Sequence, residues 1–197
     1  MSDALFRFFL AFSHGTIIIP LIIIGYLWFD RRRVFFHGTC LLLLSMAFNW
    51  ALKVTFQIPL SPELGKEGFA FPSGHMQTAF VFYGWLWRSF HNHLPVKIGI
   101  PLVLIGIGIG LVHFGYHTYF DVFGGLFFGF LLLYTYSWLL MRLKETTFLI
   151  TLFLFSTSLM VYSGLVYKIK ELTWIAYGVL VFLIFSQYVF KFKKHFP

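Results

Sequence analysis

The sequence predicts an all-α membrane protein, a polytopic transmembrane helix bundle of about six or seven spans. Of the 197 residues, 59% are hydrophobic and only 11% are charged, and the apolar residues form long runs separated by short charged segments. Soluble domains carry about 25% charged residues, so this chain could not cover a surface that faces water. The length suits a single membrane domain over residues 1–197, with no separate soluble domain.

Seven apolar runs approach the roughly 20 residues that a span requires. In chain order they cover residues 4–29, 35–56, 74–90, 97–115, 119–140, 146–166 and 172–190. The first run has an alternative, because residues 1–12 carry phenylalanines on one helical side and could lie in the membrane interface. No basic segment precedes this run, so we expect a retained span and not a cleaved signal peptide.

The basic residues predict an orientation. With seven spans, ten of the fifteen lysines and arginines fall on one side, and that side should be cytoplasmic. The ten are Arg31, Arg32, Arg33, Arg88, Lys97, Arg142, Lys144, Lys191, Lys193 and Lys194. The C-terminus is then cytoplasmic, and residues 57–72 and 116–118 lie on the outer side, which is periplasmic in the bacterial inner membrane we expect. Because topology explains the net charge of +8, we predict no nucleic-acid partner.

The turn Pro72-Ser73-Gly74-His75 begins the third predicted span, and we call it the PSGH turn. Ser73 is a suitable N-cap, and Gly74 would let a ligand approach the backbone. Free N–H groups at a helix N-terminus attract phosphate, so Ser73 and Gly74 are candidate phosphate-binding residues. The alternative is a simple helix start with an interfacial histidine.

His117 and Asp121 lie four residues apart at the start of the fifth predicted span, a spacing that puts both on one helix face. An aspartate that accepts from one ring nitrogen leaves the other nitrogen free as a base or nucleophile. The alternative is a polar pair that holds two helices together. Ionisable residues near a span are costly, which favours a functional role.

Three further residues are candidates for contacts to an anion on the same predicted side: Lys53, Lys66 and His113. Lys53 ends the second span, where a snorkelling membrane anchor is the alternative. Lys66 lies in the outer loop, and His113 lies one turn before His117. Cys, His and carboxylate residues show no spacing typical of a metal site, so we predict no metal and no other cofactor.

Together these motifs resemble the type 2 phosphatidic acid phosphatase superfamily of membrane lipid phosphatases. That family has three signatures in order: a Lys followed by Arg-Pro, then Pro-Ser-Gly-His, then Ser-Arg followed by His and, four residues later, Asp. Here the PSGH turn matches the second signature and His117-Thr118-Tyr119-Phe120-Asp121 matches the end of the third, while Lys53 stands where the first begins. The resemblance implies a catalytic core over about residues 45–140.

The resemblance implies roles for these residues. His117 would attack phosphorus and form a phosphohistidine, and Asp121 would orient and stabilise it. His75 would protonate the leaving group and then help water to attack. The PSGH turn would hold phosphoryl oxygens, and Lys53 would add positive charge. Phosphoryl transfer needs positioning and charge stabilisation, which such an arrangement provides.

The sequence departs from the family at its arginines. The Arg-Pro positions of the first signature fall on Leu60 and Ser61. The Ser-Arg positions of the third fall on Gly110 and Leu111. Two cationic phosphate ligands are therefore absent from the expected places.

Three interpretations follow from this departure. Lys66 and His113 would substitute for the arginines in a lipid phosphatase, or the protein would resemble sphingomyelin-synthase-like transferases, which move a phospho-head group to an alcohol. A catalytically weak lipid-binding or transport protein is the third. We favour the phosphatase, a hydrolase acting on a lipid phosphate or diphosphate at the outer face. Its expected partners are that lipid and the bilayer.

Overall fold

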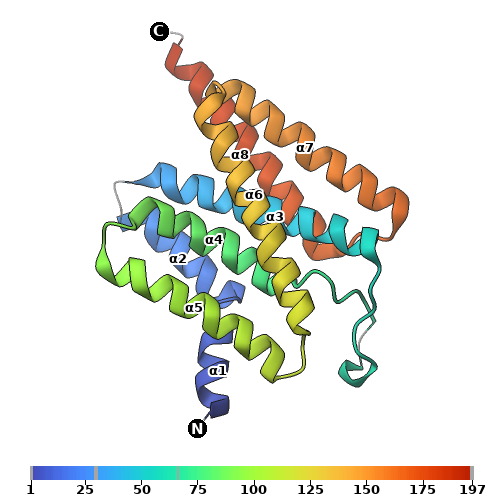
Figure 1. Cartoon of the computed structure of the whole chain (residues 1–197). Coiled ribbons are helices and arrows are strands. Elements are labelled where there is room, and N and C mark those ends of the chain that lie inside the picture. The colour runs from blue at the N-terminus through green and yellow to red at the C-terminus, as the bar shows by residue number, and fades with distance from the viewer. Residues whose placement is uncertain (1, 29–30, 66, 196–197) are drawn as a thin grey trace.

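The computed structural model describes residues 2–28, 31–65 and 67–195. These residues form α-helices and one short 3₁₀ helix, η1 (Pro62–Leu64), so the all-α prediction is confirmed (Figure 1). The α-helices are α1 (Ser2–Ala11), α2 (Gly15–Trp28), α3 (Arg32–Phe56), α4 (Gly74–Phe90), α5 (Leu94–His113), α6 (Tyr119–Arg142), α7 (Glu145–Val166) and α8 (Glu171–His195).

Five of the described helices, α3, α5, α6, α7 and α8, are long and apolar enough to cross a membrane. The pair α1–α2 passes the same test together as a bent sixth candidate, which agrees with the lower number of predicted spans. The remaining predicted span is α4, which has 17 residues. At 1.5 Å per residue it is about 25 Å long, less than the roughly 30 Å of a hydrocarbon core. It packs among α3, α5 and α6 inside the bundle (Figure 1).

The first predicted span, 4–29, is bent by 45° between α1 and α2. Two hydrogen bonds hold the bend. Ser13 Oγ donates to the Leu10 carbonyl at 2.7 Å, and the Tyr83 hydroxyl of α4 donates to the Phe12 carbonyl at 2.8 Å. α1 packs against α5, so residues 2–11 are part of the helix bundle.

α4 and α6 approach each other closely, and this approach depends on glycines of α6. A Cβ at Gly125 would lie 2.7 Å from the Ser73 carbonyl oxygen, and one at Gly129 would lie 3.3 Å from the Gln77 carbonyl oxygen. Small residues four apart let two membrane helices approach in this way. The spacing Gly125-x-x-x-Gly129 was visible in the sequence, although the motif analysis did not use it.

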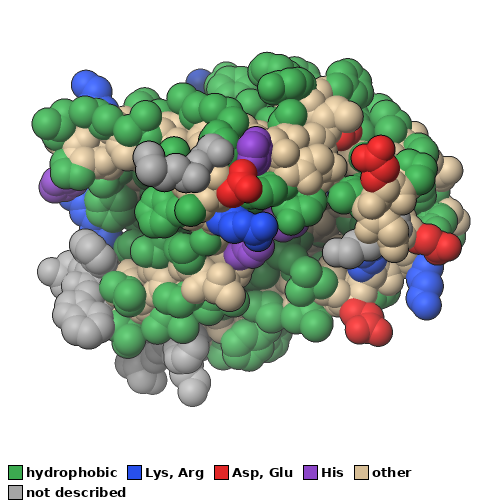
Figure 2. Space-filling view, turned by 90° about the horizontal axis from the view of Figure 1, so that it is seen from below, with side chains coloured by type: hydrophobic (Ala, Val, Ile, Leu, Met, Phe, Trp, Pro, Cys, Tyr) green, Lys and Arg blue, Asp and Glu red, His purple; other side chains and the backbone are tan. Residues whose placement is uncertain are grey.

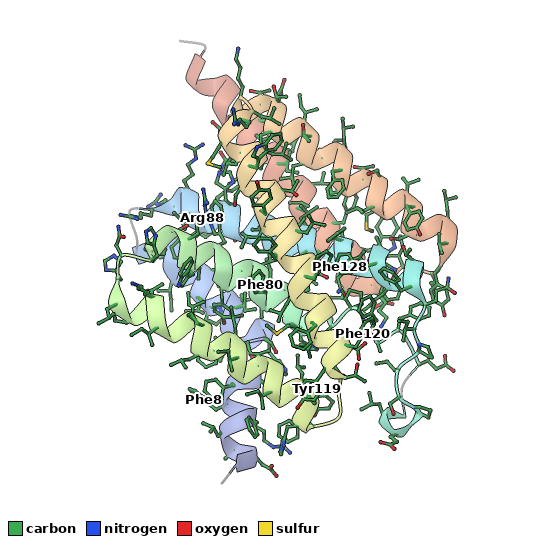
Figure 3. All side chains as sticks on the ribbon, in the orientation of Figure 1. Phe8, Phe80, Arg88, Tyr119, Phe120 and Phe128 are labelled. Carbon is green, nitrogen blue, oxygen red and sulfur yellow. The ribbon has the colours of Figure 1, made fainter. Side chains whose placement is uncertain are left out.

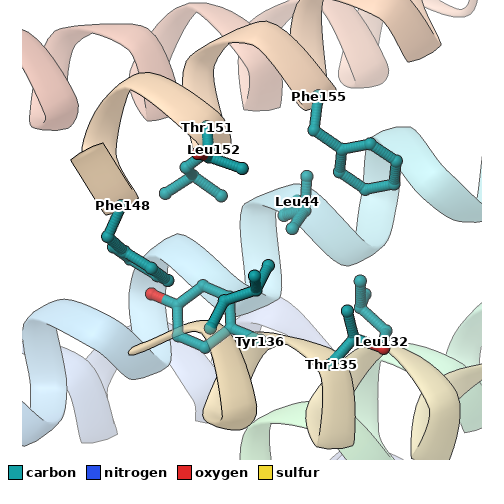
Figure 4. Close-up of a pocket in the computed structure, with 9 residues that line it drawn as sticks. Leu44, Leu132, Thr135, Tyr136, Phe148, Thr151, Leu152 and Phe155 are labelled. Carbon is teal, nitrogen blue, oxygen red and sulfur yellow. The ribbon is translucent and has the colours of Figure 1, made fainter. Parts of the chain in front are cut away.

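Apolar side chains dominate the exposed surface and line a partly open cavity. The face seen in Figure 2 is mostly hydrophobic, and its charged and histidine side chains lie near the middle and toward the two ends. Soluble monomers rarely expose apolar area on this scale, so this surface suits lipid. A cavity of about 150 Å³ lies between α3, α6 and α7, lined by Leu44, Leu132, Tyr136 and Phe155 among others (Figure 4).

Candidate active site

The two best sequence motifs meet where α4 and α6 begin. The backbone N–H of Ser73 donates to the carbonyl oxygen of Asp121 at 2.9 Å. This bond joins the PSGH turn directly to the helix that carries the predicted aspartate. Gly125, one turn further along α6, leaves the room that this approach requires.

A buried polar network fixes the PSGH turn from the side of α3. Asn49 Nδ2 donates to the Pro72 carbonyl at 3.2 Å and to Gln77 Oε1 at 3.0 Å. Gln77 Nε2 in turn lies 3.3 Å from both the carbonyl and the hydroxyl oxygen of Ser45. Satisfied networks of this kind rigidify a core because an unpaired partner would be costly. These residues were not among the predicted site residues, although polar side chains inside predicted spans were a usable signal.

The start of α4 has the features of an anion site. Ser73 is fully buried and caps the helix, accepting from the Met76 N–H at 3.5 Å. A Cβ at Gly74 would lie 2.9 Å from Asn49 Oδ1, so packing against the network calls for glycine here. The first N–H groups of α4 are therefore held in place at the positive end of a helix dipole.

His117 and Asp121 form a buried pair. Asp121 Oδ2 accepts from the Thr118 N–H at 2.8 Å and from the Thr118 hydroxyl at 2.9 Å, in a capping box that begins α6. His117 Nδ1 lies 3.6 Å from the same oxygen, and the two side chains are 9% and 4% exposed. This ring nitrogen has no hydrogen-bond partner among the described residues. A small rotation would therefore let Nδ1 donate to the carboxylate.

Electrostatics favour neutral His117. Burial is the main cause that lowers the pKa of His117, and the positive charge of Lys53 lowers it further, while the carboxylate of Asp121 opposes both. The lowered pKa leaves the imidazole uncharged near neutral pH, so a lone pair is available on the ring. Once a bond to that lone pair creates positive charge, the carboxylate of Asp121 would stabilise it.

Lys53, near the end of α3, binds the segment that precedes the PSGH turn. Its Nζ donates to the carbonyl oxygens of Phe69 and Ala70, the latter at 3.0 Å. An ammonium group has three N–H donors, so one remains for a phosphoryl oxygen. A phosphate-binding role for Lys53 stays a prediction.

His75 lies in the first turn of α4 and is exposed. It is close enough for its charge to act on His117. The structure therefore brings together His75, His117, Asp121, Lys53 and the start of α4.

The structure does not place the two other predicted phosphate ligands, Lys66 and His113, in contact with the candidate site. Lys66 is outside the described residues. His113 is engaged by α1, because its Nε2 lies 2.8 Å from Asp3 Oδ1 and its ring centroid lies 4.7 Å from that of Phe6. Contacts of His113 to phosphate stay a prediction.

The Ser-Arg positions of the third family signature are Gly110 and Leu111 here, and apolar side chains pack around both. Leu111 is buried in an apolar cluster with Leu10 and Met76. A Cβ at Gly110 would lie 3.0 Å from Leu10 Cγ, so α1 fills the space beside it. Within the described residues, no group of three or more His, Cys, Asp or Glu side chains could hold a metal ion.

Comparison with known families adds one finding. The model of the PAP2 superfamily matches residues 40–145, which is more than half of the chain. The matched segment runs from within α3 to the first residue of α7 and contains the PSGH turn and the buried pair, whereas α1, α2, α8 and the rest of α7 lie outside it. No curated protein and no solved structure was found to match the chain.

Proposed function

Because the chain belongs to the PAP2 superfamily, we propose that it is an integral membrane phosphatase that hydrolyses a lipid phosphate or diphosphate. The observation that carries the proposal is the buried pair of His117 and Asp121, joined by a backbone hydrogen bond to the PSGH turn. Phosphoryl transfer depends on positioning and charge stabilisation, and this arrangement offers both.

The reaction would proceed through a phosphohistidine. His117 attacks phosphorus with Nε2, since Nδ1 faces Asp121. The carboxylate of Asp121 orients the ring and stabilises its positive charge. His75 donates a proton to the leaving oxygen and then takes one from the water that hydrolyses the intermediate. N–H groups at the start of α4 and the free N–H of Lys53 bind the phosphoryl oxygens.

An aromatic path supports a lipid substrate. Phe120, next to Asp121, stacks on Phe71 with ring centroids 4.6 Å apart. Phe120 and Phe128 both lie on α6 (Figure 3). Centroid distances of 6.3 Å, 6.2 Å and 6.3 Å then connect Phe71 to Phe128, Phe128 to Phe48 and Phe48 to Phe155. Phe155 lines the apolar cavity (Figure 4). We infer that a hydrocarbon chain lies along these rings while its phosphate occupies the site.

The distribution of basic residues supports an outward-facing site. When α4 is counted as a crossing, so that the chain crosses seven times, most lysines and arginines lie on the side opposite the loop 57–72 and the turn before α6. We therefore place the site at the periplasmic face and the C-terminus in the cytoplasm.

The direct test is phosphate release from a panel of lipid phosphates and diphosphates in detergent, with EDTA present. We expect metal-independent release, and we expect His117→Ala to lower kcat/KM by at least about 10³-fold, because the nucleophile is lost. His91→Ala is the matched control, since His91 lies in the turn after α4, at the opposite end of that helix from His75.

Two outcomes would contradict the proposal. Undiminished release by His117→Ala would remove the proposed nucleophile. Turnover that occurs only when a second alcohol or lipid accepts the phosphoryl group would make the protein a transferase.

A further inference from the structure

His14 lies beside the proposed general acid, although it is 61 positions away in the chain. The ring centroids of His14 and His75 are 5.4 Å apart, with an angle of 43° between the rings. His14 precedes residues 40–145, so the family match does not account for it. Both histidines are exposed, and a ligand can therefore reach them.

The backbone around His14 is held in place by α4 itself. The Tyr83 hydroxyl, two turns after His75, donates to the Phe12 carbonyl at 2.8 Å. The His14 carbonyl accepts from the N–H groups of Ile17 and Ile18 at 3.1 Å, which begins α2. The bend between α1 and α2 thus has a defined geometry, and it presents His14 next to His75.

The position of His14 relates it to the leaving group. In an in-line displacement, the leaving oxygen departs on the side opposite the nucleophile, His117, and the general acid His75 lies beside that oxygen. A side chain packed against His75 is therefore next to the group that leaves. His14 also lies where α2 begins, and the positive end of a helix dipole favours negative charge there.

Two kinds of leaving group make different demands at this place. An alcohol leaves as a strong base, so it needs the proton of His75. When the substrate is a lipid diphosphate, the leaving group is the lipid monophosphate. It is a weak base, so it needs the proton of His75 less, but it carries charged oxygens that must be bound. A second imidazole beside His75 can bind the charged oxygens of a phosphate leaving group, but it gives no advantage when an alcohol leaves.

We propose that His14 is a specificity-determining residue that binds the inner phosphoryl group of a lipid diphosphate, so that the protein prefers diphosphates to monophosphates. The inference rests on the proposed phosphatase function. His117 Nε2 forms a bond to the outer phosphorus, and the bond from that phosphorus to the bridging oxygen breaks. The electron pair stays on the bridging oxygen of the lipid monophosphate, which takes the proton of His75, and the other oxygens of this leaving group accept hydrogen bonds from His14. Water then releases inorganic phosphate from His117 and gives its proton to His75.

The test compares a polyprenyl diphosphate and the monophosphate of the same chain length as substrates of the full-length protein in detergent. We expect His14→Ala to lower kcat/KM for the diphosphate by about 10-fold or more, because a hydrogen bond to a charged group is lost. For the monophosphate we expect a change of less than about twofold. His14→Gln, which keeps an N–H donor, should retain more diphosphate activity than His14→Ala.

The controls separate this inference from the proposed function. His91→Ala should change neither substrate's kcat/KM, and thermal unfolding of each variant checks the fold. Equal losses for both substrates, or no loss for the diphosphate, would overturn the role of His14 and leave the phosphatase intact. Failure of the unmodified protein to release phosphate from either substrate would overturn the proposed function and this inference with it.

Discussion

Among the residues that the structure describes, two His–Asp pairs differ in separation and in burial. The exposed pair, Asp3 and His113, has the shorter separation, 2.8 Å, with side chains that are 67% and 37% exposed. The buried pair, His117 and Asp121, is separated by 3.6 Å and is 9% and 4% exposed. The shorter contact joins the start of α1 to the end of α5 at the surface, and the longer one lies at the candidate site.

For a catalytic role, the burial of a His–Asp pair and its hydrogen bonds to the surrounding structure matter more than the distance between the two side chains. Water and salt screen the exposed pair, whose contribution to stability is small. In the buried pair, Asp121 is held by Thr118 and its backbone is bonded to Ser73, so the carboxylate keeps its place without help from His117. An aspartate held in this way can support a change of charge on the histidine during a reaction.

Removal of the charge from the buried pair should have the largest effect. Asp121→Asn keeps an oxygen that can accept from Thr118, so the fold should persist. We expect kcat/KM for phosphate release to fall by about 10²–10³-fold, because the positive charge on His117 in the intermediate loses its partner. The assay is phosphate release together with a thermal unfolding curve. Near-normal activity in a folded variant would mean that the buried pair is structural.

The pH profile distinguishes the two charges that act on His117. Neutral His117 is the active form, so the acid limb of kcat/KM reports its pKa. Asp121 raises the pKa of His117, so Asp121→Asn should move the acid limb to lower pH. Lys53 lowers the pKa of His117, so Lys53→Met should move the limb to higher pH. Shifts in the same direction would show that the limb belongs to another group.

The packing that supports the buried pair should be sensitive to one added methyl group. Gly125→Ala would place a Cβ 2.7 Å from the Ser73 carbonyl oxygen, and overpacking typically costs about 1–3 kcal/mol. We expect a lower unfolding temperature together with reduced activity. The matched control is Gly99→Ala in α5, where a Cβ meets nothing within 4 Å and helix propensity should improve. If both variants behaved alike, the close approach of α4 and α6 would be unimportant.

The exposed pair should give the smallest effect. Asp3→Asn removes the ion pair with His113, and surface pairs contribute about 0.2–1 kcal/mol. Thermal unfolding should therefore shift slightly, and less so at high salt, where the charges are already screened. A large, salt-independent loss of stability would show that this pair fastens α1 to α5.

The success of sequence analysis depended on how local each feature is. His117 and Asp121 are four residues apart, and the PSGH turn is continuous, so spacing alone could identify them. The predicted shared helix face was wrong, because His117 precedes Thr118, the N-cap of α6, and only Asp121 lies in the helix. The pair of Asp3 and His113 spans 110 positions, and no local pattern indicates it. Such contacts depend on where α1 crosses α5, which the bend after Ala11 decides.

Local sequence patterns also did not predict the hydrogen bonds of the interior network or the bend of the first span. Asn49 and Gln77 were visible as polar residues in predicted spans, but their pairing depends on the rotation of α3 and α4 about their axes. The run 4–29 was predicted as one span, although Ser13-His14-Gly15 interrupts its apolar pattern at the bend. Hydropathy measures how apolar a run is, and it does not respond to a hydrogen bond such as that from Tyr83 to Phe12.

The most direct test of the central claim is to locate the phosphoryl group on the protein. His75→Ala should slow hydrolysis of the intermediate, so this variant is incubated with a lipid phosphate and quenched in alkali, which preserves phosphohistidine. Mass spectrometry of the peptides then identifies the modified residue. We predict phosphate on His117. Turnover of the lipid with no phosphate on His117, or with phosphate on another residue, would contradict the account.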